Sequence, residues 1–309
     1  MPRYLVSIAG QSNELGSGPT GSKSRTSGFG APYIDTGNRG WWPACIEAMG
    51  RRGVWLDVSN TAIGSTSLCD SWVGRCRTWG SGMIVTRGSY VLSGGGLWRC
   101  NLAASTAAAS TNAPTGTTDT TGADSVPWVY VGVPAAGDTD GTVYASGSAR
   151  FDPNGYIAAA IAAIATRPGY DAKGVYVSIG QGDHTVSSTR AQYGTAMQRI
   201  AQHVTGLGYF CWLGVTIGMS GVDSATITTH DATMTGVIQA GRADALAALA
   251  GNTLVRAGAD LREAIGVPTA TAVDTTRSAV NSTDYLHATS ATYDQIGPIV
   301  AAAFAAGGW

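Results

Sequence analysis

Apolar residues along the chain fall into short runs that alternate with segments of helical period. Apolar runs of this length predict buried strands, here at residues 4–9, 53–59, 175–179, 209–217 and 253–257. The segments with helical period predict helices at residues 42–49, 157–166, 189–204, 229–249 and 291–305. Strands and helices that alternate at this spacing indicate an α/β fold with a largely parallel sheet.

This alternation stops between about residues 80 and 150. Here the chain is rich in Gly, Ser and Thr and has no helical period, and aromatic residues stand among turn signals. Residues 90–100 place a Gly-Gly-Gly turn between apolar residues, a pattern typical of a β-hairpin. We therefore predict one α/β domain, built from residues 1–80 and 150–309, with a β-rich insertion over residues 81–149.

Composition narrows the classes of partner. Charged residues make up 13% of the chain, and 19 Lys and Arg against 20 Asp and Glu give a net charge of −1. Because no basic patch is visible, we do not expect nucleic acid as a partner. No apolar run is long enough to cross a membrane, and residues 1–4 lead into a strand without the segments of a signal peptide. We expect neither membrane insertion nor a signal peptide, and the sequence indicates no oligomeric state.

The cysteines and histidines do not form a metal-binding pattern. The five cysteines are odd in number and include no Cys-x-x-Cys pair, so we interpret them as free, partly buried thiols: Cys45, Cys69, Cys76, Cys100 and Cys211. The four histidines are scattered along the chain, at His184, His203, His230 and His287. We expect no metal and no organic cofactor.

A nucleophile and its base are predicted near opposite ends of the chain. The sequence Gly-Gln-Ser-Asn at residues 10–13 follows the first predicted strand, which is where α/β enzymes place a nucleophile. Asp284 and His287 precede the last predicted helix. A histidine activates a serine by taking its proton, and a carboxylate orients the imidazole. Each residue alone is more often a turn or surface residue, but together Ser12, His287 and Asp284 predict Ser-His-Asp chemistry.

This order of residues resembles the SGNH (GDSL-like) hydrolases, and Gly-Gln-Ser-Asn resembles their carbohydrate-esterase branch, the sialic-acid-acetylesterase-like group. The resemblance implies a three-layer α/β/α sandwich with a mostly parallel, flavodoxin-like central sheet. It implies that Ser12, Asp284 and His287 are the catalytic triad. It also implies an oxyanion hole made by the N–H groups of Ser12 and Gly64 and by the side chain of Gln181.

Two motifs carry the oxyanion-hole part of the resemblance. Gly-Ser-Thr-Ser at residues 64–67 is similar to the branch's Gly-Gly-Thr-Ser, with a serine in place of the second glycine, so either residue could donate its N–H. Gln-Gly-Asp-His at residues 181–184 is similar to the branch's Gln-Gly-Glu, with a shorter carboxylate that could orient a loop or a neighbouring side chain. A strand-terminating turn and a loop histidine are the alternative interpretations. The substrate-binding candidates are Gln11, Asn13, Ser65, Asp183 and His184.

The resemblance implies an esterase that removes short acyl groups, acetyl above all, from an acylated glycan or polysaccharide. A lipase-type or thioesterase-type acyl hydrolase stays open, as does a non-catalytic glycan-binding phage-tail or adhesin protein. Residues 86–132 resemble small three-stranded modules of the chitin-binding type, which recur in phage tail proteins. This implies that exposed Tyr90, Trp98 or Trp128 stacks on sugar rings, the alternative being an insertion that packs its own aromatics. The protein is accordingly expected in the cytoplasm, or outside the cell as part of a virion.

Overall fold

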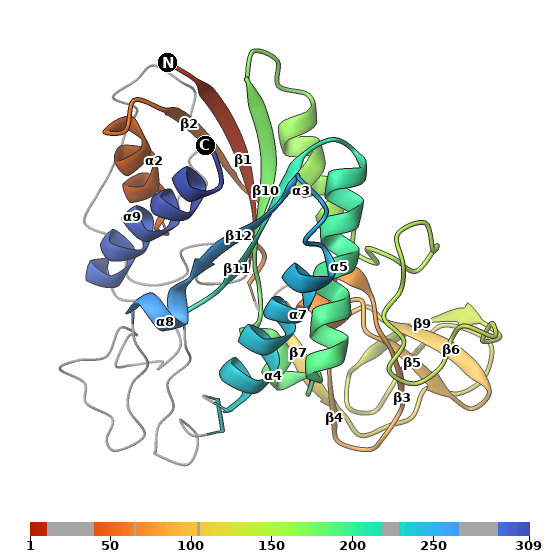
Figure 1. Ribbon diagram of the computed structural model, residues 1–309. Helices are drawn as coiled ribbons and strands as arrows, with labels where there is room; N and C mark the ends of the chain where they lie inside the picture. Colours follow the sequence, from red (N-terminus) through yellow and green to blue (C-terminus); the bar gives the residue numbers. More distant parts are fainter. Residues whose placement is uncertain (11–39, 65, 104–105, 218–228, 231, 266–289) are drawn as a thin grey trace.

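A five-stranded sheet forms the centre of the protein (Figure 1). The computed structural model describes residues 1–10, 40–64, 66–103, 106–217, 229–230, 232–265 and 290–309. The order across the sheet is β12-β11-β10-β1-β2, and all four pairings are parallel. The chain therefore has a mixed α/β fold. The strands are β1 (Arg3–Gly10), β2 (Trp55–Asn60), β10 (Ala172–Ser178), β11 (Phe210–Val215) and β12 (Val255–Asp260).

The apolar runs place all five strands to within a few residues because the central strands are buried along most of their length. Residues 5–10 of β1 and 174–178 of β10 are buried, as expected for parallel strands covered by helices. β10 begins three residues earlier than its apolar run. Gly174 lies there against Trp212, and a Cβ would come within 2.5 Å of the indole ring. The position therefore requires glycine, and because glycine is not counted as apolar, the apolar run does not reveal the start of the strand.

One face of the sheet is covered by aliphatic helices. Leu5, Val175 and Leu213 of the sheet pack with Ile161 and Met197 of these helices in a single core. The predicted helix over residues 229–249 contains a π-helical segment, η2 (Met234–Gln239), before its last α-helical part. The α-helices of this face are α3 (Tyr156–Ala165), α5 (Arg190–Gly206) and α7 (Ala240–Ala248).

Two helices from the two ends of the chain cover the opposite face, as Figure 1 shows. They approach closely at Gly297, where a Cβ would lie 2.4 Å from the backbone nitrogen of Cys45. The terminal Trp309 stacks on Tyr4 at the amino end of β1, with 4.7 Å between ring centroids. The last helix therefore begins at the carboxyl edge of the sheet and ends at its amino edge. The elements of this face are α2 (Trp42–Gly50), α8 (Leu261–Ile265) and α9 (Ser290–Ala306).

A second five-stranded sheet and a two-stranded one lie between residues 76 and 132, so the β-rich region begins at residue 76, before the predicted start of the insertion at residue 81. The insertion is larger than the three strands that the chitin-binding resemblance implies, because its outermost strands are too short to show in the sequence pattern. The larger sheet has the order β3 (Cys76–Thr78), β5 (Tyr90–Ser93), β6 (Gly96–Cys100), β9 (Pro127–Gly132) and β8 (Thr120–Thr121). The smaller sheet pairs β4 (Met83–Thr86) with β7 (Ala107–Ser110).

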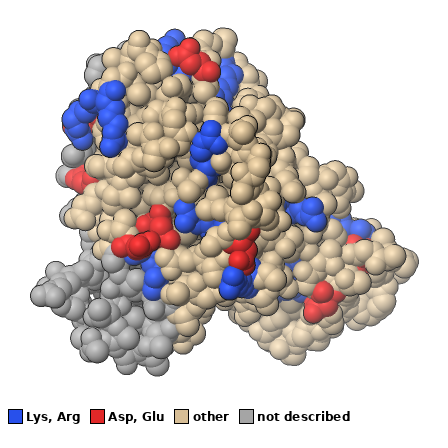
Figure 2. All heavy atoms as spheres, viewed as in Figure 1, with Lys and Arg blue, Asp and Glu red and all other residues tan. Residues whose placement is uncertain are grey.

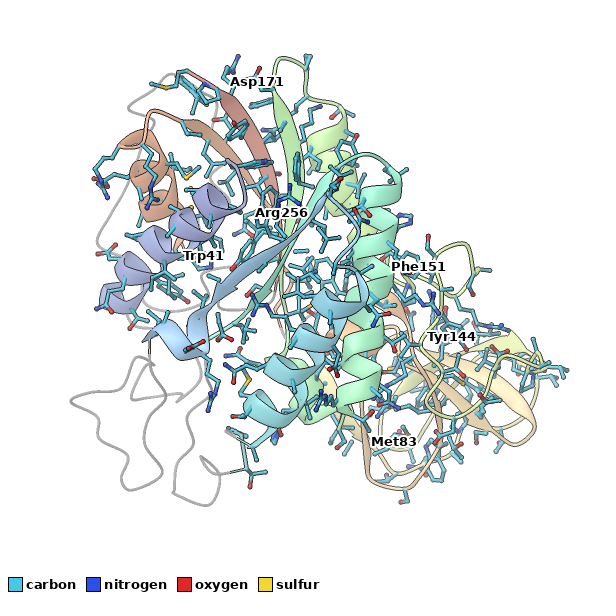
Figure 3. The ribbon with its side chains drawn as sticks, in the orientation of Figure 1. Trp41, Met83, Tyr144, Phe151, Asp171 and Arg256 are labelled. Carbon is cyan, nitrogen blue, oxygen red and sulfur yellow. The ribbon has the colours of Figure 1, made fainter. Side chains whose placement is uncertain are left out.

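The insertion lies beside α5 (Figures 1 and 3), and the segment that leads from it to α3 contacts both ends of that helix. A Cβ on Gly141 would lie 2.9 Å from Gln192 Nε2 in the first turn. The Phe151 ring lies 5.1 Å from the His203 ring of α5, between centroids. Ser146 Oγ lies 2.7 Å from His203 Nδ1. On the face that Figure 2 shows, Lys and Arg side chains are interspersed with Asp and Glu. Among the described residues, no helix combines the length and apolar character needed to span a membrane.

Candidate active site

Half of the predicted site can be located in the structure. Gln11, Ser12, Asn13, Ser65, Asp284 and His287 lie outside the described residues. Gly64 and the residues of the Gln-Gly-Asp-His motif lie at the carboxyl edge of the parallel sheet, whereas the two predicted tryptophans lie in the insertion. The site is therefore built here from the backbone and side chains that frame the carboxyl ends of β1 and β10.

The loop that carries Gly64 is fastened to the end of β1. The Thr61 N–H donates to the Ile8 carbonyl oxygen at 3.2 Å, and the Ile63 N–H donates to the Gly10 carbonyl oxygen at 3.0 Å. These bonds continue the parallel pairing of β1 and β2 beyond the last residue of β2. Gly64 is consequently buried beside Gly10, the first residue of the predicted nucleophile motif.

A buried tryptophan fixes the rest of this loop. Trp72 Nε1 donates to Thr66 Oγ1 at 2.9 Å, and that hydroxyl donates to the Ile63 carbonyl oxygen at 2.8 Å. Trp72 is fully buried in the core below η1 (Leu68–Val73). Sequence reasoning missed the role of Thr66, because a threonine in a turn carries no signal of its own.

The Gln-Gly pair packs directly on this loop. Gln181 begins α4 (Gln181–Thr185) and is only 3% exposed, and its Nε2 donates to the Ile217 carbonyl oxygen at 3.4 Å. A Cβ on Gly182 would lie 2.2 Å from the backbone oxygen of Thr66. Only a glycine permits this approach, so the turn after β10 and the loop after β2 meet beside the end of β1.

Asp183 locks the two segments together. Its buried carboxylate accepts hydrogen bonds from the backbone N–H groups of Leu68 at 2.7 Å and Cys69 at 3.1 Å, and from Ser188 Oγ at 2.8 Å. Burial raises the pKa of the Asp183 carboxyl, and these hydrogen bonds oppose the rise. Asp183 thus holds the first turn of η1 beside α4, which is one of the two roles that the sequence left open for it beside its place among the substrate-binding candidates.

A second buried carboxylate joins the same segment to the insertion. Asp70 in η1 pairs with Arg75 and Arg77, each at 2.8 Å, and accepts a hydrogen bond from Ser89 Oγ at 2.9 Å. Burial alone would raise the pKa of Asp70, but the two guanidinium groups outweigh it and hold that pKa below its ordinary value. Sequence reasoning missed this cluster, whose one signal is the alternation of Arg and Cys at residues 75–77.

His184 lies at the mouth of the same turn. It is half-buried, its Nδ1 lies 2.8 Å from Thr233 Oγ1, and its ring lies edge-to-face with that of His230 at 4.4 Å between centroids. Burial lowers the pKa of the His184 imidazole, and the nearby His230 lowers it further. His184 therefore stays neutral at a pH where an exposed imidazole is partly charged.

The two predicted tryptophans of the insertion do not form a sugar platform. Trp98 is 0% exposed and Trp128 is 1% exposed, and Tyr90 is also buried. Trp98 and Trp128 pack together with Val91 and Val126 in the core of the insertion. The expectation of exposed, sugar-stacking rings is thus wrong for these residues. A module of this size can form a dry core only by burying its large aromatic rings.

The remaining candidate groups are inert or dispersed. All five cysteines are free and buried, which confirms the prediction of free thiols, and burial raises the pKa of Cys76 and of Cys100 to about 11. Within the described part of the chain, no three His, Cys, Asp or Glu side chains gather as metal ligands. The polar groups that converge are those at the carboxyl edge.

Comparisons of the chain with models of protein families, with curated proteins and with solved structures find no match. The functional assignment therefore rests on the geometry of the carboxyl edge and on the motifs that supply it.

Proposed function

We propose that the protein is a serine esterase of the SGNH type, which removes short acyl groups, acetyl above all, from an acylated glycan. One observation carries the proposal: the Gly64 loop and the Gln181 turn meet beside Gly10, after which the chain continues to Ser12. Helices on both faces of the parallel sheet support the α/β/α sandwich of that superfamily. The parallel-sheet unit, residues 1–80 and 150–309, then carries the chemistry.

The strand order supports the position of the site. With this order the direction of winding reverses between β1 and β10, and open α/β sheets bind ligands at the carboxyl ends of the strands at such a point. Ser12 follows Gly10 by two residues in the sequence, and His287 precedes the start of α9 by three. Both the end of β1 and the start of α9 belong to the carboxyl edge, so the proposed triad enters from one side of the sheet.

The proposed reaction has two steps. Ser12 Oγ attacks the ester carbonyl carbon while His287 takes the hydroxyl proton, and Asp284 orients the imidazole. The proton passes from His287 to the leaving alcohol, and an acyl-serine remains. Water, deprotonated by His287, then attacks the acyl carbon, releases the carboxylic acid and returns the proton to Ser12.

The described residues supply the oxyanion hole in this scheme. The buried Gln181 amide and the N–H of Gly64 are held on packed backbone, as electrostatic stabilisation of a developing oxyanion requires. Asp183 and Thr66 fix the positions of these two donors relative to each other. Each of them joins the loop that carries Gly64 to the turn that carries Gln181. None of the steps in this proposed mechanism uses a metal ion.

The test is hydrolysis of p-nitrophenyl acetate and acetate release from a panel of O-acetylated glycans. Ser12→Ala is expected to reduce kcat by at least three powers of ten without unfolding the protein, since triad loss is typically that large. Ser81→Ala, at an exposed position in the insertion, is the control. Retention of more than about a tenth of the wild-type kcat would contradict the proposal. Longer-chain esters and thioesters distinguish acetylesterase activity from that of a lipase or thioesterase.

A further inference from the structure

Arg75 lies at the neck of the insertion, residues 74–76 and 141–144, where the chain enters and leaves the inserted sheet. Its backbone forms an antiparallel bridge with Val143, and the Cys76 N–H donates to the Thr142 carbonyl oxygen at 2.8 Å. The side chain of Arg75 is only 1% exposed. Because a buried guanidinium group is tolerated only where acceptors surround it, its partners show what the neck is fastened to.

The three nitrogens of this guanidinium group donate to three separate segments of the chain. Nε donates to Asp70 Oδ1 in η1 at 2.8 Å. Nη1 donates to Gln192 Oε1 in the first turn of α5 at 2.7 Å, and Nη2 donates to the Val186 carbonyl oxygen, directly after α4, at 2.9 Å. A planar group with fixed donor directions specifies the positions of its acceptors more strictly than an ammonium group does. Arg75 therefore fixes η1, α4 and α5 relative to one another.

The contact with Val186 leads to the proposed oxyanion donor through the single turn of α4. The Val186 N–H donates to the Gly182 carbonyl oxygen at 3.2 Å, so the acceptor of the guanidinium group is itself bonded to the residue after Gln181. The segment η1, which holds the other end of the guanidinium group, begins four residues after Gly64. Asp183 joins the same two segments directly, so the loop and the turn of the proposed oxyanion hole are tied by two routes.

Arg75 is charged in the folded protein. Burial alone would lower the pKa of its guanidinium group, but the Asp70 carboxylate outweighs burial and raises that pKa. A neutral residue at position 75 would remove one of the two charges that compensate the buried Asp70. Lysine keeps the charge, but its donors radiate from one atom and cannot span three segments. Arg75→Lys therefore separates the geometry of the guanidinium group from its charge.

We infer that Arg75 is a positioning residue for the oxyanion hole: from the neck of the insertion it holds the Gln181 turn in place against the Gly64 loop. This inference rests on the proposed function and deepens it, because it gives the inserted sheet an effect on the reaction rate that needs no sugar-binding ring. Arg75 acts mainly through the Gln181 amide. Its loss should displace that amide, and a displacement of about 1 Å can cost about 10²-fold in rate.

The test is a double-mutant cycle of Arg75→Lys and Gln181→Ala, measured as kcat and KM for p-nitrophenyl acetate. Arg75→Lys alone is expected to lower kcat by about tenfold to 10²-fold with little change in KM. In the Gln181→Ala protein the same substitution should lower kcat by less than about threefold, since a residue that acts through another loses its effect when that other is removed. Arg99→Lys is the matched control, because Arg99 Nη1 also donates to a backbone carbonyl oxygen, that of Pro153, at 2.9 Å. Equal losses in both backgrounds, or an unchanged kcat in Arg75→Lys, would overturn the inference.

Hydrogen exchange tests the same inference without the reaction. In Arg75→Lys the backbone N–H groups of Asp183 and Val186 should exchange at least about tenfold faster than in the wild type, while that of Val177 in β10 stays protected. Unchanged exchange in α4 would refute the inference whether or not the protein hydrolyses esters. Failure of the proposed function has a different signature: wild type and Ser12→Ala are equally inactive on every ester, yet Arg75→Lys still loosens α4.

A milder variant serves if Arg75→Lys does not fold. Gln192→Ala removes one acceptor of the guanidinium group at the half-buried start of α5 and leaves the buried ion pair with Asp70 intact. It should show the same pattern with a smaller fall in kcat, again lost in the Gln181→Ala background. A fall of equal size in both backgrounds would count against the inference as it does for Arg75→Lys.

Discussion

The buried cores of the parallel sheet and of the inserted sheet divide aliphatic and aromatic side chains differently. The parallel-sheet core under α2 and α9 is rich in aromatic rings such as Trp212 and Phe304. The core on the first face of the parallel sheet is mainly aliphatic, with Leu5, Val175 and Leu213 against apolar helices. The insertion has no α-helix of its own in the described chain and closes its core with Trp98 and Trp128. A small domain buries a smaller fraction of its surface than a large one, so each large buried ring weighs more in the stability of the insertion than in that of the parallel-sheet unit.

The same contrast appears in how the two regions use polar groups. At the carboxyl edge, the backbone N–H groups of Leu68 and Cys69 donate to the buried carboxylate of Asp183, close in sequence to the buried Gln181 amide. At the junction with the insertion, Asp70 is fully buried and pairs with Arg75 and Arg77. The segment η1 belongs to both groups, since Asp183 holds its first turn and Asp70 lies within it. The polar groups of the two regions thus tie η1 to different parts of the chain, Asp183 to α4 and Asp70 to the start of the inserted sheet.

Removal of an aromatic ring from the insertion is the strongest test of this contrast. Trp98→Ala is expected to cost about 3–5 kcal/mol of unfolding free energy, because it leaves a large cavity in a small core. Urea unfolding measures this loss. Val133→Ser changes a side chain that is 78% exposed on the same module and should stay within about 0.5 kcal/mol of wild type.

Activity of the Trp98→Ala protein then separates a structural ring from a sugar-binding one. Hydrolysis of a small soluble ester and of a polymeric substrate should fall together, in step with the unfolded fraction. A stable variant that loses activity on the polymer alone would show instead that Trp98 contacts the glycan.

Sequence reasoning succeeded where one physical pattern decides the structure. The parallel strands are apolar because they are buried on both faces, so their positions could be predicted from residues such as Leu5 and Val175. The inserted sheet could not be read in this way, since β8 has only two residues and β3 pairs in parallel with β5 through a short connection. Burial of Trp98 depends also on the pairing of β6 with β9, which lies far along the chain and which no local pattern encodes.

The site shows the same limit. The motif predicts that Gln181 and Gly64 belong together, and the structure brings their segments into contact. The residues that cause the contact, Thr66 and Ser188, are small polar residues of turns, whose common role is to cap local backbone. Their hydrogen-bond partners are close in the sequence, as for any turn residue, so spacing alone could not show that Thr66 also contacts Gly182.

Removal of the amide from the carboxyl edge should affect catalysis more than folding. Gln181→Ala is expected to lower kcat by roughly 10²–10³, equivalent to about 2.7–4 kcal/mol, with little change in KM, because an oxyanion donor acts mainly in the transition state. Steady-state kinetics on p-nitrophenyl acetate measure both constants. Gln239→Ala, which removes an amide bonded to Asp260 and Arg262, is the matched control. A rise in KM with unchanged kcat would make Gln181 a substrate-binding residue instead.

The smallest expected effect comes from Ser188, which supports Asp183 without reaching the proposed reaction centre. Ser188→Ala removes the hydroxyl that donates to Asp183 Oδ1 at 2.8 Å, at an expected cost of about 1–3 kcal/mol in unfolding free energy. The carboxylate keeps the N–H groups of Leu68 and Cys69, so kcat should fall by less than about tenfold. Thr185→Ala, an exposed neighbour in the same turn, serves as the control.

The pH dependence of the Ser188→Ala effect identifies its cause. Burial raises the pKa of Asp183 and the Ser188 hydrogen bond lowers it, so the substitution raises that pKa further. A carboxyl whose pKa is higher in the folded than in the unfolded state stabilises the fold at a pH below its unfolded-state pKa of about 3.9. This contribution is lost as the pH rises. The stability difference between wild type and variant should therefore be smallest in acid and largest near neutral pH. A difference that does not change with pH would mean that Ser188 acts only by packing.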